Sequence, residues 1–260
     1  MGAPEFPEIW DLTRGSLRSR SAELLPVAAA FLFLPALVVQ RFAGALSLAS
    51  PPSGEEALPV LLLLGAALAL QLIGQIALTG MTLATGAEET VADHLRRGLR
   101  LVVPGLAVSI VQSLGVALGI GLLLQPELLP LGLLVIFGPG LYLFVRLSVA
   151  LAALTDQAGG ALTALMRSWE LTRGHGLRLY GWYVLLLSGL FLMTAILGLF
   201  ARATGAVVKL AVGPAEAGWG PGEWLEALVS TAAGAAATAI LVVFAAMLYR
   251  GLGAARSSAG

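Results

Sequence analysis

The chain has 260 residues, of which 58% are hydrophobic and only 12% are charged. Soluble domains carry roughly 45–50% apolar and about 25% charged residues, so this composition and a mean hydropathy of +0.91 exclude a soluble protein. Fifteen basic and fifteen acidic side chains leave no net charge to attract nucleic acid, and the absence of cysteine excludes disulfides, thiolate metal sites and a cysteine nucleophile.

We expect no signal peptide, because residues 1–23 are polar and contain no apolar stretch. After them, six segments are free or almost free of charge over about the 20 residues that a helix needs to cross the hydrocarbon layer. They predict membrane helices over residues 22–42, 57–85, 101–124, 128–155, 179–202 and 225–250. These segments are apolar throughout and do not alternate as the strands of a β-barrel do. The predicted fold class is an all-α polytopic membrane protein, with residues 1–260 as a single membrane domain.

The basic residues predict the orientation of the spans, because short cytoplasmic loops carry an excess of lysine and arginine. Only Arg41, Arg202 and Lys209 fall on one side of the six spans. The opposite side holds Arg14, Arg18, Arg20, Arg96, Arg97, Arg100, Arg167, Arg173, Arg178, Arg250 and Arg256. We therefore expect both termini in the cytoplasm. The carboxylates expected to stay in water on the far side are Glu55, Glu56, Glu216, Glu223 and Glu226.

A sequence pattern recurs three times along the chain. Residues 9–18 read IWDLTRGSLR and residues 168–178 read SWELTRGHGLR, while ADHLRRGLR at residues 92–100 is a weaker copy. Each copy precedes two predicted spans, so the repeated unit is a short helix followed by a transmembrane hairpin. Two crossings per unit make the repeats parallel and predict a pseudo-threefold arrangement about the membrane normal. The three predicted repeats cover residues 5–85, 86–157 and 158–252.

The three short helices are predicted to be amphipathic and to lie in the headgroup layer, with tryptophan on an apolar face and arginine opposite. In the third, the apolar face would carry Leu162, Leu165 and Trp169. The arginines would attract anionic lipid phosphates, each contributing about 1 kcal/mol. The helices could serve as anchors that fix the topology, or as a dedicated site for a lipid or a protein partner. The residues expected at this interface are Trp10, Arg14, Arg18, Arg97, Arg100, Trp169, Arg173 and Arg178.

Two stretches in the second half of the chain resemble a known family. YLFVRL at residues 142–147 and ALMRSWELTRG at residues 164–174 are similar to the YciC-like bacterial proteins. They are also similar to the membrane domain found with some glycerophosphoryl diester phosphodiesterases. In those families a YxxxRL-type helix is followed by an RSWxLTxG-type segment. The resemblance implies a six-helix protein of the bacterial inner membrane with no settled biochemical activity. The phosphodiesterase catalytic domain is a separate soluble unit with no counterpart here.

Arg146 lies inside the fourth predicted span, 10 residues before Asp156, which is about 15 Å along a helix. Burying an arginine at the bilayer centre costs at least ~2.5–3.5 kcal/mol, so its side chain should reach toward the cytoplasm or find acceptors in the bundle. Gly138, Pro139 and Gly140 precede it and should kink the helix, because proline lacks an N–H and clashes with the preceding turn. Arg146 could be a structural clamp or could contact a substrate or lipid.

Gln71, Gln75 and Thr79 recur at every fourth position of the second span, so they share one helix face that should point toward protein. Gln112 and Ser113 of the third span add to this polar set. Interhelical hydrogen bonds, averaging about 0.6 kcal/mol each, would be the simpler role. A polar translocation path is the alternative. If the arginine of the fourth span faces the same interior, the bundle has a polar core.

Other small residues are assigned to helix packing, among them Gly115 and Gly119 of the third span. In the sixth span the packing residues are Ala227, Ser230, Thr231, Gly234 and Thr238.

No catalytic motif occurs, and His94 and His175 have no matching carboxylate cluster, so we expect no enzyme, metal site or cofactor. The predicted function is a non-enzymatic membrane protein that binds membrane lipids, anionic headgroups in particular, or a membrane protein partner through its basic interfacial helices. The alternative is a small transporter or flippase-like protein with a polar path inside the helix bundle. The oligomeric state is not predicted by the sequence.

Overall fold

The computed structural model describes residues 5–42, 57–84, 89–157, 159–212 and 220–257, and these contain helices but no strand. Six helices or continuous helix chains are long and apolar enough to cross a membrane. The prediction of an all-α, multi-pass membrane protein is therefore confirmed.

The spans follow one another in the predicted order. The first consists of α2 (Ser21–Ala28), η1 (Ala29–Phe33) and α3 (Leu34–Phe42), and the second is α4 (Ala57–Leu83). The third is α6 (Val102–Leu123). The fourth runs through η4 (Pro126–Leu128), α7 (Leu129–Val135), η5 (Ile136–Gly140), α8 (Leu141–Leu147) and α9 (Ala150–Asp156). The fifth and sixth are α11 (Gly176–Val212) and α12 (Pro221–Ser257).

A short helix precedes each pair of spans: α1 (Phe6–Ser19), α5 (Val91–Arg100) and α10 (Ala161–Leu171). The glycines that align in the three sequence copies nevertheless have different surroundings. A Cβ on Gly15 would meet nothing, whereas one on Gly98 would collide with the Ile73 carbonyl oxygen. Of these three glycines, only Gly174 has a positive φ, of 86°, a conformation that glycine adopts without a steric penalty. It lies in the turn between α10 and α11. The threefold relation of the units stays a prediction.

Two spans are interrupted by π-helical turns. Gly138, Pro139 and Gly140 lie in η5, at the predicted break in the fourth span. The turn widens the helix where proline offers no N–H and crowds the preceding carbonyl. A second interruption separates α8 from α9 at residues 148–149, and the sequence did not indicate it. The π turn η1 of the first span, just before Pro35, was not predicted either.

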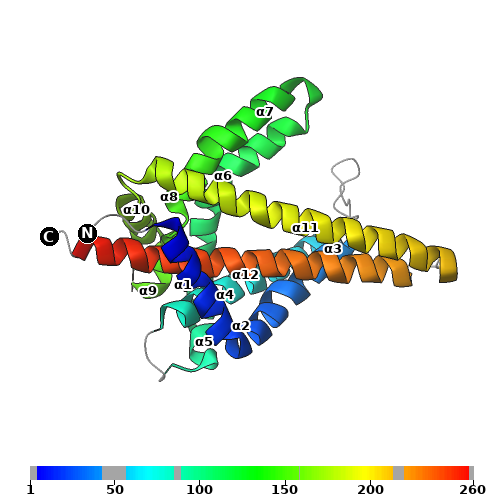
Figure 1. Cartoon of the computed structure of the whole chain (residues 1–260), viewed down its shortest axis with the longest axis horizontal. Helices are drawn as coiled ribbons and strands as arrows, with labels where there is room; N and C mark the ends of the chain where they lie inside the picture. The colour runs from blue at the N-terminus through cyan, green and yellow to red at the C-terminus, as the bar shows by residue number, and fades with distance from the viewer. Residues whose placement is uncertain (1–4, 43–56, 85–88, 158, 213–219, 258–260) are drawn as a thin grey trace.

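The α11–α12 hairpin is longer than predicted and extends past the other helices (Figure 1). Each helix has 37 residues, about 55 Å at 1.5 Å per residue, against a hydrocarbon layer of roughly 30 Å. The two helices approach so closely that a Cβ on Gly222 would collide with the carbonyl oxygen of Gly205. The fifth span was predicted to end at residue 202, but α11 continues as a helix to Val212.

Ion pairs join the far ends of this hairpin. Arg202 Nε lies 2.9 Å from Glu226 Oε1, and Lys209 Nζ lies 2.7 Å from Glu223 Oε1. Glu223 and Glu226 keep 38% and 33% of their side-chain surface exposed, so they remain in contact with solvent as expected, but each also has an ion-pair partner that was not predicted. The other carboxylates of that expectation, Glu55, Glu56 and Glu216, lie outside the described residues.

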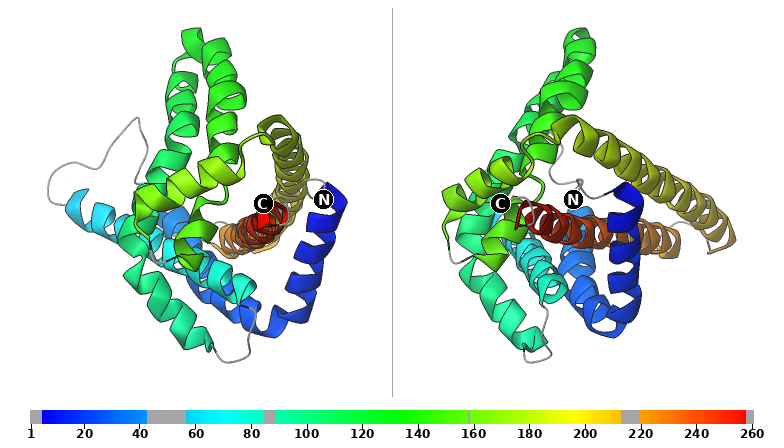
Figure 2. Two further views of the ribbon diagram at one scale, coloured as in Figure 1. Left: turned by 90° about the vertical axis from the view of Figure 1, so that its left-hand side faces the viewer. Right: turned by 60° about the vertical axis from the view of Figure 1, so that its left-hand side comes forward.

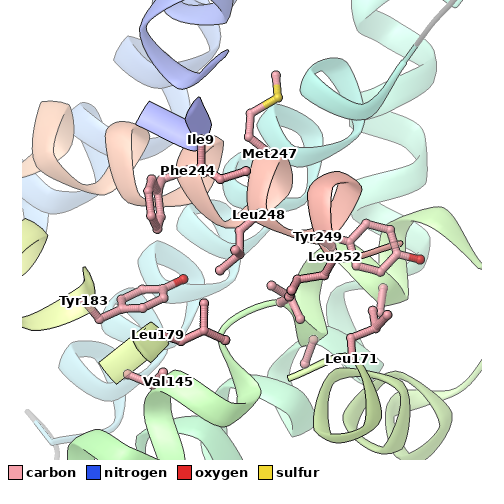
Figure 3. Packing of buried hydrophobic residues seen from close by; sticks show 14 of the residues in the cluster. Ile9, Val145, Leu171, Leu179, Tyr183, Phe244, Met247, Leu248, Tyr249 and Leu252 are labelled. Atoms are coloured by element: carbon pink, nitrogen blue, oxygen red, sulfur yellow. The ribbon is translucent and has the colours of Figure 1, made fainter. Parts of the chain in front are cut away.

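The main hydrophobic core lies where α1, α9 and α10 meet the start of α11 and the end of α12, near both chain termini (Figures 1 and 3). Its fully buried side chains include Ile9, Val145, Leu179 and Leu248. We call this the arginine-rich end. The helices that form it carry Arg14 and Arg18 (α1), Arg167 (α10), Arg178 (α11) and Arg250 (α12). Along the spans beyond it, large apolar side chains are exposed, as expected for lipid-facing helices.

The α6–α7 hairpin diverges from the α11–α12 hairpin (Figures 1 and 2). Glycines hold its two arms together. A Cβ on Gly115 would collide with Gly140, and one on Gly119 would collide with Ile136 and approach Gly132. The predicted close approach at Gly115 and Gly119 is confirmed.

Replacing Gly119 by valine should separate α6 from α7, because there is no room for the added side chain. We expect overpacking to lower the free energy of unfolding by about 1–3 kcal/mol, measured by unfolding in mixed detergent micelles. Gly121→Val is the matched control, since a Cβ on Gly121 would meet nothing within 4 Å. Equal stability of the two variants would contradict the glycine contact.

Candidate functional site

The apolar face of α1 is covered by protein. Ile9 and Thr13 are buried, and the ring of Phe6 contacts the rings of Trp182 and Phe244 at centroid distances of 5.9 Å. Trp10 is half-buried beside it. The expected division of faces is present, but the apolar face packs on α12 and α11, so it is not free to enter the headgroup layer.

The opposite face of α1 is exposed and basic. Arg14 and Arg18 lie on it, and neither has an ion pair within the described part of the chain. Arg20 ends the helix and donates to the carbonyl oxygens of Met81 and Ala84, with 3.0 Å between its Nη2 and the Ala84 oxygen. It therefore caps the carbonyl end of α4, where cations are stabilised by the helix dipole.

Helix α5 lies against α4, and two of its arginines form ion pairs with nearby carboxylates of the same segment. Arg97 Nη2 lies 3.0 Å from Glu89 Oε1, whereas Arg100 makes no ion pair among the described residues. His94 is buried against Gly80, with its Nε2 3.5 Å from Glu89 Oε2 and its Nδ1 without a hydrogen-bond partner.

Helix α10 presents an apolar face outward, unlike α1. Ala164, Ser168 and Leu171 are buried. The exposed apolar side chains are Leu162, Met166 and Trp169, at 71%, 57% and 44% exposure. The small side chains face the protein because they allow a close approach to α8. Beyond α10, Arg173 and Arg178 are exposed, and the Arg178 guanidinium lies 5.1 Å from the ring centroid of Trp182.

Arg146 is only 5% exposed, and its guanidinium carbon lies 4.1 Å above the ring centroid of Trp169. Its carbonyl oxygen accepts hydrogen bonds from Ser168 Oγ at 2.9 Å and Thr172 Oγ1 at 3.2 Å. Its Nε has no partner, and no described carboxylate pairs with it. The YxxxRL and RSWxLT stretches therefore contact one another directly, and the ring of Trp169 takes the place of a counter-ion.

A polar cavity of about 330 Å³ lies between the spans, where all three hairpins meet. Gln75 and Gln112, predicted to face the interior, both line it, whereas Gln71 does not. Arg146 is also absent from its walls, so the condition for a polar core shared with that arginine is not met at this cavity. The polar wall residues are Gln75, Thr79, Ser109, Gln112, Ser113, Ser148, Tyr183 and Thr238.

Tyr183, which the sequence did not single out, is one of the wall residues, and its hydroxyl is buried. It is 2% exposed, and its ring makes edge contacts with Phe144 and Phe244 at 6.1 and 5.6 Å. Its hydroxyl has no hydrogen-bond partner among the described residues. The nearby Ser148 hydroxyl donates to the Val145 carbonyl oxygen at 2.8 Å.

Buried residues flank the cavity in both directions along the spans, including Leu186 and Ala235 on the side away from the arginine-rich end. One turn beyond its walls toward the arginine-rich end, Leu179, Leu248 and Leu154 are at most 1% exposed.

A second polar contact inside the membrane joins α3 to α12. Gln40 Nε2 donates to Ser230 Oγ at 3.2 Å, and Thr231 Oγ1 donates to Gln40 Oε1. Ser230 and Thr231 therefore do more than allow close packing. The sequence did not indicate this pair, because Gln40 and Arg41 stand together at the end of the span and form no periodic polar face.

Comparison of the chain with family models, curated proteins and solved structures finds no match.

Replacing Trp169 by leucine should leave the buried Arg146 without a covering ring. We expect a loss of about 1–2 kcal/mol in the free energy of unfolding, the range for a desolvated cation–π contact. In the Arg146→Met background the same substitution should cost much less, which a double-mutant cycle measures. Met166→Ala, on the exposed face of α10, is the control. A coupling energy near zero would contradict the stacking role.

His94 should make stability depend on pH. Burial lowers its pKa below the ordinary value, opposed by Glu89 and Asp93 and assisted by Arg97 and Arg20. The unfolded chain therefore takes up the proton first, and stability should fall as the pH drops below about 6.5. Melting temperatures of wild type and His94→Gln between pH 7.5 and 5 measure the effect, with His175→Gln as the control. An unchanged slope in His94→Gln would contradict it.

Proposed function

We propose that this integral membrane protein binds an anionic membrane lipid at α1, with an acyl chain held between α2 and α12. No catalytic role is proposed. The proposal rests on an apolar groove that begins beside the unpaired arginines of α1.

The groove has a volume of about 420 Å³. Leu17 and Ser21 lie at its arginine-rich end, and from there it runs along α2 and the π turn η1. Its other wall is an alanine face of α12, where small side chains leave the space open. The groove residues of α12 include Ala232, Ala235, Ala236 and Ala239. Lipid chains surround the spans, so an acyl chain is the occupant whose chemistry fits these walls.

The charges at the mouth fit an anionic headgroup. Arg14 precedes Leu17 by about one helical turn, and Arg18 follows it directly. Because neither arginine has an acid partner in the described chain, both are available to a lipid phosphate. Each basic residue near a membrane surface contributes about 1 kcal/mol of attraction to anionic lipid. Arg100, Trp169, Arg173 and Arg178 remain candidates for weaker contacts with the surrounding lipid.

The resemblance to the YciC-like proteins belongs to this proposal, as does the placement in a bacterial inner membrane with both termini in the cytoplasm. The resemblance is supported by the direct contact between the two stretches that carry it, through Arg146, Ser168 and Thr172. A membrane protein partner at the exposed face of α10 is compatible with the same layout.

A second candidate function, a small transporter or flippase-like protein, is favoured by the polar cavity between the spans. Because Arg146 is not in the cavity wall, the polar side chains that a transported molecule would contact there are glutamines and hydroxyl groups.

Lipid binding should depend on Arg14 and Arg18. We expect the Arg14→Gln/Arg18→Gln variant to bind phosphatidylglycerol roughly 30-fold more weakly, from two contributions of about 1 kcal/mol. Ala236→Phe should also weaken binding, by filling the groove. Native mass spectrometry of the protein, titrated with phosphatidylglycerol or phosphatidylcholine in detergent, measures bound lipid.

The matched control is Arg173→Gln/Arg178→Gln, which removes two exposed arginines at the same end of the molecule. It should weaken binding only slightly. An equal loss in both double variants, with no effect of Ala236→Phe, would indicate diffuse surface attraction and contradict a lipid site at α1.

A further inference from the structure

We propose that the polar cavity between the spans binds a small uncharged molecule that carries several hydroxyl groups. The site shares no residue with the lipid groove, so the inference does not depend on lipid binding. It rests on the second candidate function only in naming the class of molecule that such a transporter would carry.

The residues that line the cavity favour a ligand without charge. Every residue that lines the cavity is uncharged at neutral pH. A charged ligand in this position would lose its hydration without gaining a counter-ion, which costs several kcal/mol inside a membrane. Arg146, the buried cation nearest in sequence to the wall residues Phe144 and Ser148, is directed to Trp169 instead.

Hydroxyl groups on the ligand follow from how the wall hydroxyls are already used. Thr79 donates to the Gln75 carbonyl oxygen at 2.7 Å, and Thr238 donates to the Gly234 carbonyl oxygen at 2.9 Å. Ser148 likewise donates its hydroxyl proton to the carbonyl oxygen of Val145 in α8. The oxygens of these side chains can therefore only accept a hydrogen bond from a ligand. The wall is rich in acceptors, which favours a ligand rich in donors.

Tyr183 supplies the complementary group. Its hydroxyl is buried without a partner and can both donate and accept. Leaving such a group unpaired is unfavourable, and a ligand or water that reaches it from the cavity would supply the missing hydrogen bond. The amides of Gln75 and Gln112 add further donors and acceptors. Phe144 provides an apolar wall beside them, suited to a carbon skeleton.

The size and access of the cavity fit a small molecule. Its volume of about 330 Å³ is at the lower end of the roughly 300–1,000 Å³ of small-molecule sites. Entry would be beside Ser113 of α6, an exposed residue of the cavity wall. The hydroxylated group could belong to a free polyol or to the headgroup of a neutral lipid.

Saturation-transfer NMR on the full chain in phosphatidylcholine nanodiscs tests the proposal. The probes are xylitol as a free polyol, monooleoylglycerol as a hydroxylated lipid, and glycerate as a charged molecule of similar chemistry. We expect xylitol or monooleoylglycerol to bind and glycerate not to bind. Which of the two binds in a Tyr183-dependent way identifies the source of the hydroxyl groups.

Tyr183→Phe removes only the unpaired hydroxyl and should weaken binding about fivefold to tenfold, the effect of one neutral hydrogen bond. Gln112→Leu should weaken it as well. Tyr180→Phe is the matched control, because the Tyr180 hydroxyl donates to the Phe137 carbonyl oxygen and is not part of the cavity wall. It should leave binding unchanged.

No binding of xylitol or monooleoylglycerol to the wild type would overturn the proposal, as would equal losses in Tyr183→Phe and Tyr180→Phe or equally tight binding of glycerate. Arg14→Gln/Arg18→Gln should bind the probe normally, which separates this site from the lipid groove. Polyol flux into proteoliposomes is a separate readout: binding without flux would remove the transport candidate and leave the binding site in place.

Discussion

The backbone carbonyl of Arg146 accepts hydrogen bonds from Ser168 of α10 and from Thr172 at its end, while Trp169 of the same helix covers the Arg146 guanidinium. This contact ties the fourth span to the start of the third hairpin. The chain breaks at residues 148–149, and beyond the break α9 packs against α4 while α10 contacts α8. The buried layer around Val145, Leu179 and Leu248 forms at the same place, and it closes the spans at the arginine-rich end.

Away from that layer, the spans separate. Glycine contacts hold each hairpin together internally, as at Gly115 with Gly140 and Gly205 with Gly222, but the hairpins diverge from one another (Figure 1). Divergence from a closed end leaves room for the polar cavity and for the apolar groove beside α12. Both proposed sites are thus consequences of one feature: tight packing at one end of the molecule and lipid-exposed helices along the rest.

The sequence predicted the spans well because the length of an uncharged segment depends on composition alone. Of the face predicted to point inward, Gln75 and Thr79 line the cavity, whereas Gln71 is half-exposed and does not. Amphipathicity could not decide which side of α10 faces protein, because Ala164 and Ser168 provide a close-packing surface that hydropathy does not register. The ends of α11 and α12 were missed because Arg202 and Lys209 resemble loop residues until their partners are known. Tyr183 was missed because its unpaired hydroxyl depends on three-dimensional neighbours.

The central claim is that the turns bearing arginine lie together on one face of the membrane and the far end of the long hairpin lies on the other. Because the chain has no cysteine, single cysteines can be introduced as Arg96→Cys, Arg173→Cys and Val207→Cys and labelled with an impermeant maleimide in sealed, oriented vesicles. The account predicts that positions 96 and 173 label from the same side and position 207 from the opposite side. Labelling of positions 96 and 173 from opposite sides would contradict it.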